Sequence, residues 1–120
     1  EFPRLAFCGT RGWTAPGGRE FTQQDQKIFD REILRLKLSL DSVKDADEII
    51  VLLHFPPFTD RGGECQINNL LEQYPVSHVV FGHIHGEGLK AVTEGDIGDI
   101  TYHLVSCDHL NFSPKLIKEF

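Results

Sequence analysis

The sequence of 120 residues contains no methionine and only three cysteines, Cys8, Cys65 and Cys107. These cysteines form no C-x-x-C pair, and an odd number cannot be joined completely in disulfides within one chain. We therefore expect reduced thiols, as in the cytoplasm, with Cys8 and Cys107 packed in the core. Because a natural reading frame begins with methionine, the opening residues 1–3 indicate an excised piece, a processed product or a cloning remnant.

The sequence also lacks long apolar runs and an excess of basic residues. No apolar run approaches the roughly 20 residues that a membrane-spanning helix needs, and no signal peptide opens the chain. The formal net charge is −6, which disfavours a general nucleic-acid binder and a protein of anionic membranes, since both need a clustered basic face. With 40% hydrophobic and 25% charged residues, the composition is typical of a single globular domain, residues 1–120.

Strand and helix patterns alternate along the chain. Thr22 and Asp25 have the spacing of a helix N-cap, and apolar residues then recur at helical spacing as far as Lys44. The runs at 48–54 and 77–82 are continuously apolar, which is typical of strands covered on both faces. The expected elements are strand 4–9, helix 22–44, strand 48–54, helix 66–74, strand 77–82 and a hairpin of 89–92 with 100–107. This order predicts an α/β fold with a mainly parallel sheet that ends in an antiparallel hairpin.

Three histidines fall where predicted strands end. His54 closes the apolar run 48–54, while His83 and His85 follow the run 77–82. In extended backbone, residues i and i+2 point to the same side, so His83 and His85 can reach one metal ion or two neighbouring ions. A single histidine at a strand end is more often a structural residue, but three that converge on one sheet edge favour metal binding.

The motifs around these histidines resemble those of a known family. LLHFPPF (52–58) and FGHIHGEG (81–88) are similar to the C-terminal half of calcineurin-like metallophosphoesterases, which have a lone metal-binding histidine after one strand and G-H-x-H after the next. FCGTRGWTAPG (7–17) and LVSCDHLNFSP (104–114) resemble a bacterial subgroup of predicted phosphohydrolases. The resemblance extends over residues 4 to 118 and implies a metal-dependent hydrolase of phosphoester substrates.

The same resemblance implies the roles of the histidines. His54 and His83 would bind one metal of a dinuclear pair and His85 the other, so that an activated water attacks phosphorus. The cofactors would be two divalent ions, and imidazole suits Mn, Fe, Zn and Ni without selecting among them. Separately, Arg11 lies in a glycine-rich loop, where its planar guanidinium could bind a substrate phosphate.

The family also has D-x-H, G-D-x-x-D and G-N-H-[DE] motifs, and none of them precedes His54 here. In the family they supply a bridging carboxylate, an Asn ligand and the catalytic histidine. We therefore expect the C-terminal half of an αββα sandwich, with no catalytic residue of its own and no activity alone. Such a half should pair through an exposed sheet face, either with the missing N-terminal half or with a second copy.

Other residues and functions stay open. Trp13 and Phe58 are expected to be packing anchors, with an aromatic substrate wall as the alternative. Asp108 is expected to cap a strand end, although it could instead orient a ligand histidine, and His78 and His103 are expected to be structural. The chain could also be a mononuclear zinc hydrolase or zinc module that uses the three histidines alone, or a non-catalytic α/β interaction domain.

Overall fold

The computed structural model describes residues 3–119, apart from the side chain of Ala91, and contains one five-stranded sheet with the strand order β1-β2-β3-β5-β4. The strands are β1 (Leu5–Thr10), β2 (Glu48–Leu53), β3 (Val76–Phe81), β4 (Gly95–Ile97) and β5 (Ile100–Leu104). β1, β2, β3 and β5 run parallel, and β4 pairs antiparallel with β5 at the edge. The predicted α/β fold with a mainly parallel sheet and a terminal antiparallel pair is therefore confirmed.

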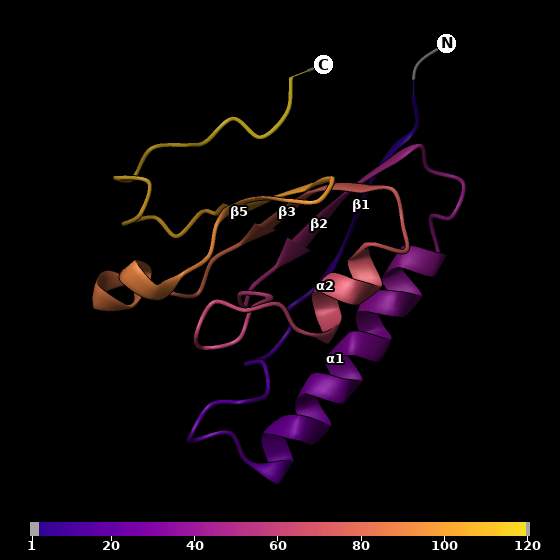
Figure 1. Cartoon of the computed structure of the whole chain (residues 1–120). Coiled ribbons are helices and arrows are strands. Elements are labelled where there is room, and N and C mark those ends of the chain that lie inside the picture. Colours follow the sequence, from indigo (N-terminus) through magenta and orange to yellow (C-terminus); the bar gives the residue numbers. More distant parts are fainter. Residues whose placement is uncertain (1–2, 120) are drawn as a thin grey trace.

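Helices α1 (Gln23–Asp41) and α2 (Gln66–Leu71) lie on one face of this sheet (Figure 1). The capping box that the sequence predicted is present: the Thr22 side chain accepts from the Asp25 backbone N–H at 3.1 Å, and the Asp25 carboxylate accepts from the Thr22 N–H at 2.9 Å. The apolar stripe of α1 then buries Phe29, Leu36 and Leu40 completely. Within residues 3–119, no helix combines the length and the apolar character needed to cross a membrane.

The segment 89–92 differs from the prediction. We expected it to be the first strand of the terminal hairpin, but residues 89–91 belong to the 3₁₀ helix η1 (Gly86–Ala91), Val92 follows that helix, and the hairpin is built from β4 and β5. The tight turn falls at Gly98, whose φ of 61° suits glycine. Because Ile97 pairs with Ile100 across that turn, the strand before it occupies 95–97 and not 89–92.

The opposite face of the sheet is only partly covered. The segment after β5 runs along this side (Figure 1), where Lys118 Nζ lies 2.8 Å from Glu48 Oε1 at the start of β2. Beneath it Ile50 is buried, whereas Phe7 and Leu52 keep 61% and 48% of their surface exposed. Since Gly9 pairs with Leu52 in the parallel register, Phe7 and Leu52 point to the same side and form an apolar patch on this face.

Candidate metal centre

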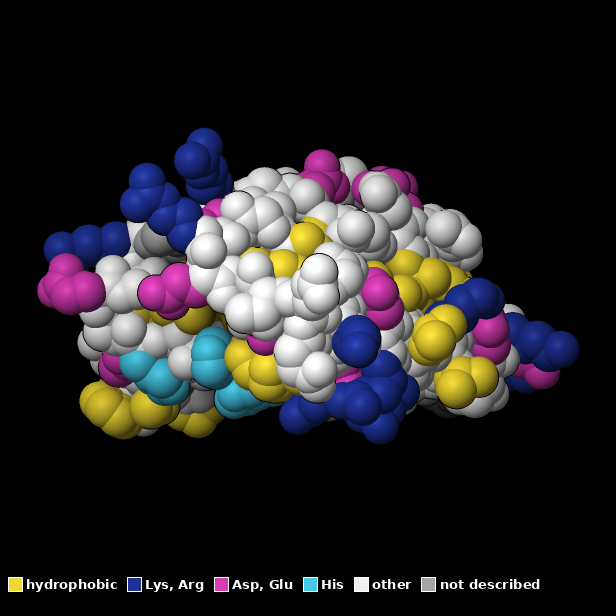
Figure 2. Space-filling model, turned by 90° about the horizontal axis from the view of Figure 1, so that it is seen from below, with side chains coloured by type: hydrophobic (Ala, Val, Ile, Leu, Met, Phe, Trp, Pro, Cys, Tyr) yellow, Lys and Arg dark blue, Asp and Glu magenta, His cyan; other side chains and the backbone are white. Residues whose placement is uncertain are grey.

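His54 and His83 meet at the edge of the sheet where the parallel strands end. His54 follows the last residue of β2, and His83 lies two residues after the end of β3. Because β2 and β3 are parallel neighbours, their carboxyl ends deliver both side chains to the same place. His54 Nε2 lies 3.0 Å from His83 Nδ1. Figure 2 shows histidine side chains gathered on one face of the molecule, with hydrophobic side chains beside them.

The backbone of His54 is held from both sides. Its N–H donates to the Arg11 carbonyl at 3.0 Å, and its own carbonyl accepts from the Gly82 N–H at 3.2 Å. The neighbouring Phe55 N–H also donates to the Arg11 carbonyl, at 2.9 Å. These bonds extend the strand pairing beyond the sheet, so that the histidine leaves a fixed backbone and not a mobile loop.

His83 occupies a strained turn. Its φ is 71°, and the Ile84 N–H donates to the Gly82 carbonyl at 2.9 Å across it. A hydrogen bond between residues i and i+2 around a central residue of positive φ defines the rarer and more strained form of γ-turn. Strain of this kind costs about 1–3 kcal/mol and clusters at functional sites, and here it aims the ring at His54.

The surroundings of His83 favour its neutral form. Its ring packs against Phe55 with the centroids 4.2 Å apart. This partial burial, followed by the neighbouring imidazoles of His54 and His85, lowers the pKa of His83 below its usual value. A metal ligand must offer an unprotonated nitrogen, and neutral imidazole is available here at neutral pH.

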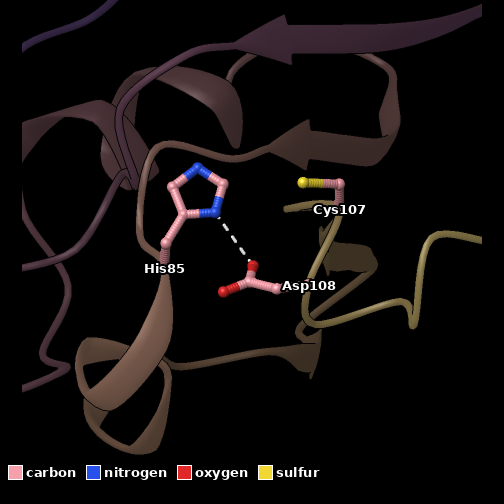
Figure 3. Close-up of side chains that lie close together, drawn as sticks. All are labelled: His85, Cys107 and Asp108. Carbon is pink, nitrogen blue, oxygen red and sulfur yellow. Dashed lines mark hydrogen bonds and ion pairs between the residues drawn. The ribbon is translucent and has the colours of Figure 1, made fainter.

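His85 is oriented by a carboxylate from another part of the chain. Its Nδ1 lies 2.9 Å from Asp108 Oδ1, while Asp108 Oδ2 accepts from the Gly86 N–H at 2.8 Å (Figure 3). The Gly86 N–H, followed by the His85 ring, lowers the pKa of Asp108, so the carboxylate stays ionised. An Nδ1–H that donates to a carboxylate leaves Nε2 with a free lone pair, which is the usual arrangement of a metal-binding histidine.

The donor set of the first pair suits a divalent metal. Two imidazole nitrogens bound at about 2.0–2.1 Å lie about 2.9–3.4 Å apart when the angle at the metal is roughly 90–110°. The 3.0 Å between His54 Nε2 and His83 Nδ1 falls within this range. The residues present therefore fit the metal that the sequence motifs implied, with His54 and His83 at one position and His85 Nε2 available for another.

Cys107 is exposed, and not in the core as expected, whereas Cys8 is buried. Cys107 follows β5 in the segment that carries Asp108, and strand pairing ends before this residue.

Ligand atoms of His85, Cys107 and Asp108 lie within 4.8 Å of one another (Figure 3). Both Asp108 oxygens already accept hydrogen bonds, from His85, Gly86 and the His109 N–H, so this carboxylate serves as an orienting group. From the sequence, a strand cap is the favoured role of Asp108 and an orienting role the alternative.

Arg11 contributes through its backbone to the position of His54, but its side chain turns elsewhere. Arg11 Nε lies 3.5 Å from Glu32 Oε2, and its guanidinium lies 4.9 Å from the centre of the Trp13 ring. Trp13 in turn donates to Asp25 at 3.0 Å, which ties the glycine-rich loop to the start of α1. Trp13 thus acts as the expected anchor, while phosphate binding by Arg11 stays a prediction.

Glu32 is a buried carboxylate of α1 that no sequence motif marks. It accepts from Thr10 Oγ1 and, at 2.6 Å, from Arg35. Burial alone would raise the pKa of Glu32, but the bonds from Thr10 and Arg35 and the charge of Arg11 outweigh it, and the net effect is a lowered pKa. Glu32 therefore fastens the end of β1 and the loop behind His54 to α1.

The letters GDIGD at 95–99 repeat the G-D-x-x-D pattern, although after the histidines and not before them. They form β4 and its turn into β5, where Asp96 accepts from Thr101 at 2.6 Å. The turn lies at the start of β5, which runs parallel to β3, so it belongs to the opposite edge of the sheet. Its carboxylates cannot supply the missing ligands of this centre.

The remaining histidines lie away from the pair. His78 Nδ1 and His103 Nε2 are 3.0 Å apart on the sheet face opposite the helices, and His103 is buried. His103 Nδ1 has no hydrogen-bond partner within residues 3–119. His109 Nε2 lies 3.1 Å from Glu94 Oε1 and joins the segment after β5 to the segment before β4.

Comparison with protein families gives a match over residues 1–87 to the model described as calcineurin-like phosphoesterase. The matched region contains β1, both helices, β2, β3 and the motifs of His54, His83 and His85. It ends before Asp108. Comparisons with curated proteins and with solved structures gave no match.

Proposed function

The chain belongs to the calcineurin-like phosphoesterase family, and from this premise we propose that it carries three histidine ligands of a dinuclear centre for phosphoester hydrolysis. His54 and His83 hold one divalent ion, and His85 holds the second. Asp108 orients His85, and the Arg11 guanidinium binds a substrate phosphate when it leaves Glu32. The observation that supports this proposal most directly is the distance of 3.0 Å between His54 Nε2 and His83 Nδ1.

A bound pair of divalent ions supplies an acidified water and neutralises charge on the attacking and leaving oxygens of a phosphoester. The residues of this chain supply binding and orientation. The γ-turn and the strand ends fix two imidazoles against each other, and Asp108 keeps the His85 proton on Nδ1. His85 Nε2 is therefore left without a proton and free to bind metal, while His54 Nε2 and His83 Nδ1 face each other at 3.0 Å across the proposed position of the first ion.

The centre is incomplete in the proposed scheme. A dinuclear site needs ligands for both ions, and three imidazoles without a bridging carboxylate hold metal weakly. The D-x-H, G-D-x-x-D and G-N-H-[DE] ligands come from an N-terminal half that packs on this one. The apolar patch of Phe7 and Leu52 is the sheet face on which that half, or a second copy, would lie. Static light scattering at micromolar concentration tests the second copy, and a strict monomer would contradict self-association.

Metal titration and a phosphatase assay test the proposal. We expect the chain to bind Mn²⁺ weakly in calorimetry, and His83→Ala to abolish this binding because one of two adjacent nitrogens is lost. Against an aryl phosphomonoester and a diester with added Mn²⁺, we expect negligible turnover. In a longer chain that includes the other ligands, His85→Ala should remove most of the activity and leave the fold intact.

The control variant is His109→Ala, because His109 is exposed, its side chain pairs with Glu94 and not with the candidate ligands, and the substitution keeps the backbone N–H that donates to Asp108. It should leave Mn²⁺ binding unchanged. Robust metal-dependent turnover by the 120-residue chain, abolished by His85→Ala, would instead favour the mononuclear zinc hydrolase. Absence of metal binding even with the other ligands present would favour the non-catalytic interaction domain.

A further inference from the structure

A pocket of about 260 Å³ opens beside His83. Its wall is formed by the loop after β1, the segment 55–60 after β2 and the segment 83–93 after β3. His83 is part of this wall as well as of the imidazole pair, and the Phe55 ring, also in the wall, packs on it at 4.2 Å. A group in the pocket therefore lies directly next to the proposed metal position.

The wall is mainly apolar, with hydroxyl groups but no lysine or arginine among the residues described there. None of the described residues that line it is a lysine or arginine, and Asp60 is the acidic one among them. An anionic group would meet the Asp60 carboxylate with no lysine or arginine in the described wall to compensate it, so the pocket disfavours a second phosphate or a carboxylate. The apolar members of the wall are Ala15, Phe55, Pro56, Phe58, Ile84 and Val92, and the hydroxyl groups are those of Thr14, Thr59 and Thr93.

The floor of the pocket is rigid. Phe58 is buried at 6% exposure, and its ring packs edge-on against Tyr102 at 5.0 Å and Phe81 at 6.0 Å. Tyr102 is itself fixed because its hydroxyl accepts from the Asn68 amide at 3.1 Å. A rigid apolar floor favours a flat ring, which loses little conformational freedom on binding.

The volume limits the size of the occupant. A dry apolar cavity of roughly 150 Å³ holds one benzene molecule. At about 260 Å³, the pocket accommodates one ring or two fused rings, and is too small for a peptide segment or a long acyl chain.

We propose that this pocket binds the uncharged ring of the substrate, an aryl or heteroaryl group of one or two rings whose phosphoryl group lies at His54 and His83. The assignment of the phosphoryl group rests on the proposed function of the histidines. Ring binding stands on the pocket itself. Substrates with a second phosphate on the leaving group are poor ligands of this site.

The first part of the test uses the 120-residue chain and phenol, which has a ring and no phosphorus. We expect the backbone amide signals of Thr14, Thr59 and Thr93 to shift together in two-dimensional NMR. Thr14 is exposed at the rim, so Thr14→Trp should close the pocket without disturbing the core and abolish these shifts. Thr14→Ser is the matched control and should keep them. Absent or scattered shifts in the parent chain would overturn the inference.

The second part compares phenylphosphonate with methylphosphonate in the presence of Zn²⁺, which is diamagnetic. We expect phenylphosphonate to bind at least about tenfold more tightly, since even one methylene in an apolar pocket is worth roughly 10- to 200-fold. Thr14→Trp should remove this preference and leave methylphosphonate binding unchanged. Equal binding of the two phosphonates would overturn the pocket while the metal site stands. Phenol shifts without binding of either phosphonate would support the pocket and contradict the proposed function.

Discussion

The strained turn at His83 allows a test in which the effect of the backbone conformation on stability is separated from the effect of the side chain. His83→Gly and His83→Ala both remove the imidazole and its contacts with His54 and Phe55, so these losses cancel in the comparison. What remains is the φ of 71°. A residue with a Cβ is penalised by about 1–2 kcal/mol in a left-handed conformation, while glycine is penalised by about 0.4–1 kcal/mol through the freedom of its unfolded chain. We expect His83→Gly to be the more stable variant, by about 0.8 kcal/mol from the middle of these two ranges.

Urea unfolding followed by circular dichroism measures this difference directly, and thermal unfolding should show it as several degrees in Tm for a domain of this size. His85 provides the matched control, because its φ is −135° in extended backbone. There the order should reverse, with His85→Ala more stable than His85→Gly by about 0.4–1 kcal/mol. The same order at both positions, or no difference at His83, would refute the assignment of strain to the turn.

Two further predictions concern carboxylates. Glu32→Gln should lower the free energy of unfolding, measured by urea unfolding at pH 7, by about 1–3 kcal/mol, because it weakens charge-assisted hydrogen bonds. The folded-state pKa of Glu32 lies below its usual 4.5, so the stabilisation by the ionised carboxylate is present above pH 4.5 and is lost as the pH falls through the folded pKa. A difference in unfolding free energy between the parent and Glu32→Gln that persists well below that pKa would contradict this prediction. Asp108→Asn should weaken Zn²⁺ binding about 10- to 100-fold in calorimetry with an unchanged circular dichroism spectrum, and unchanged affinity would leave Asp108 only a strand cap.

The arrangement of the sheet could be predicted from the sequence because each of its signals is local. The apolar runs at 48–54 and 77–82 gave strands at Glu48–Leu53 and Val76–Phe81, and the N-cap at Thr22 placed the start of α1. Strands alternating with helices imply parallel pairing, and parallel pairing brings residues after successive strands to one edge. The meeting of His54 and His83 follows from this topology without any side-chain detail.

The supporting residues were not predictable, because their contacts join distant parts of the chain. Asp108 reaches His85 across 23 positions, and Glu32 reaches Thr10 across 22. Nothing in the local pattern of either carboxylate distinguishes an orienting group from a strand cap or an exposed helix residue. The apolar residues of 89–92 were ambiguous for a related reason, since a short apolar run fits a strand and a single helical turn equally well.

The three candidate ligands are restrained by three different structural features, and these restraints affect how tightly the centre binds metal. Hydrogen bonds from the neighbouring strand ends fix His54, a strained turn fixes His83, and Asp108 fixes His85. Ordering a free side chain on binding costs about 0.5–1.5 kcal/mol; Asp108 removes part of that cost for the His85 ring, while at His54 and His83 it is the backbone that is fixed before an ion arrives. Weak metal binding by this chain would then reflect too few ligands and not mobile ones. Supplying carboxylates from a second polypeptide should therefore raise affinity without reorganising the histidines, and unchanged NMR signals of the His83 turn on assembly would be the corresponding observation.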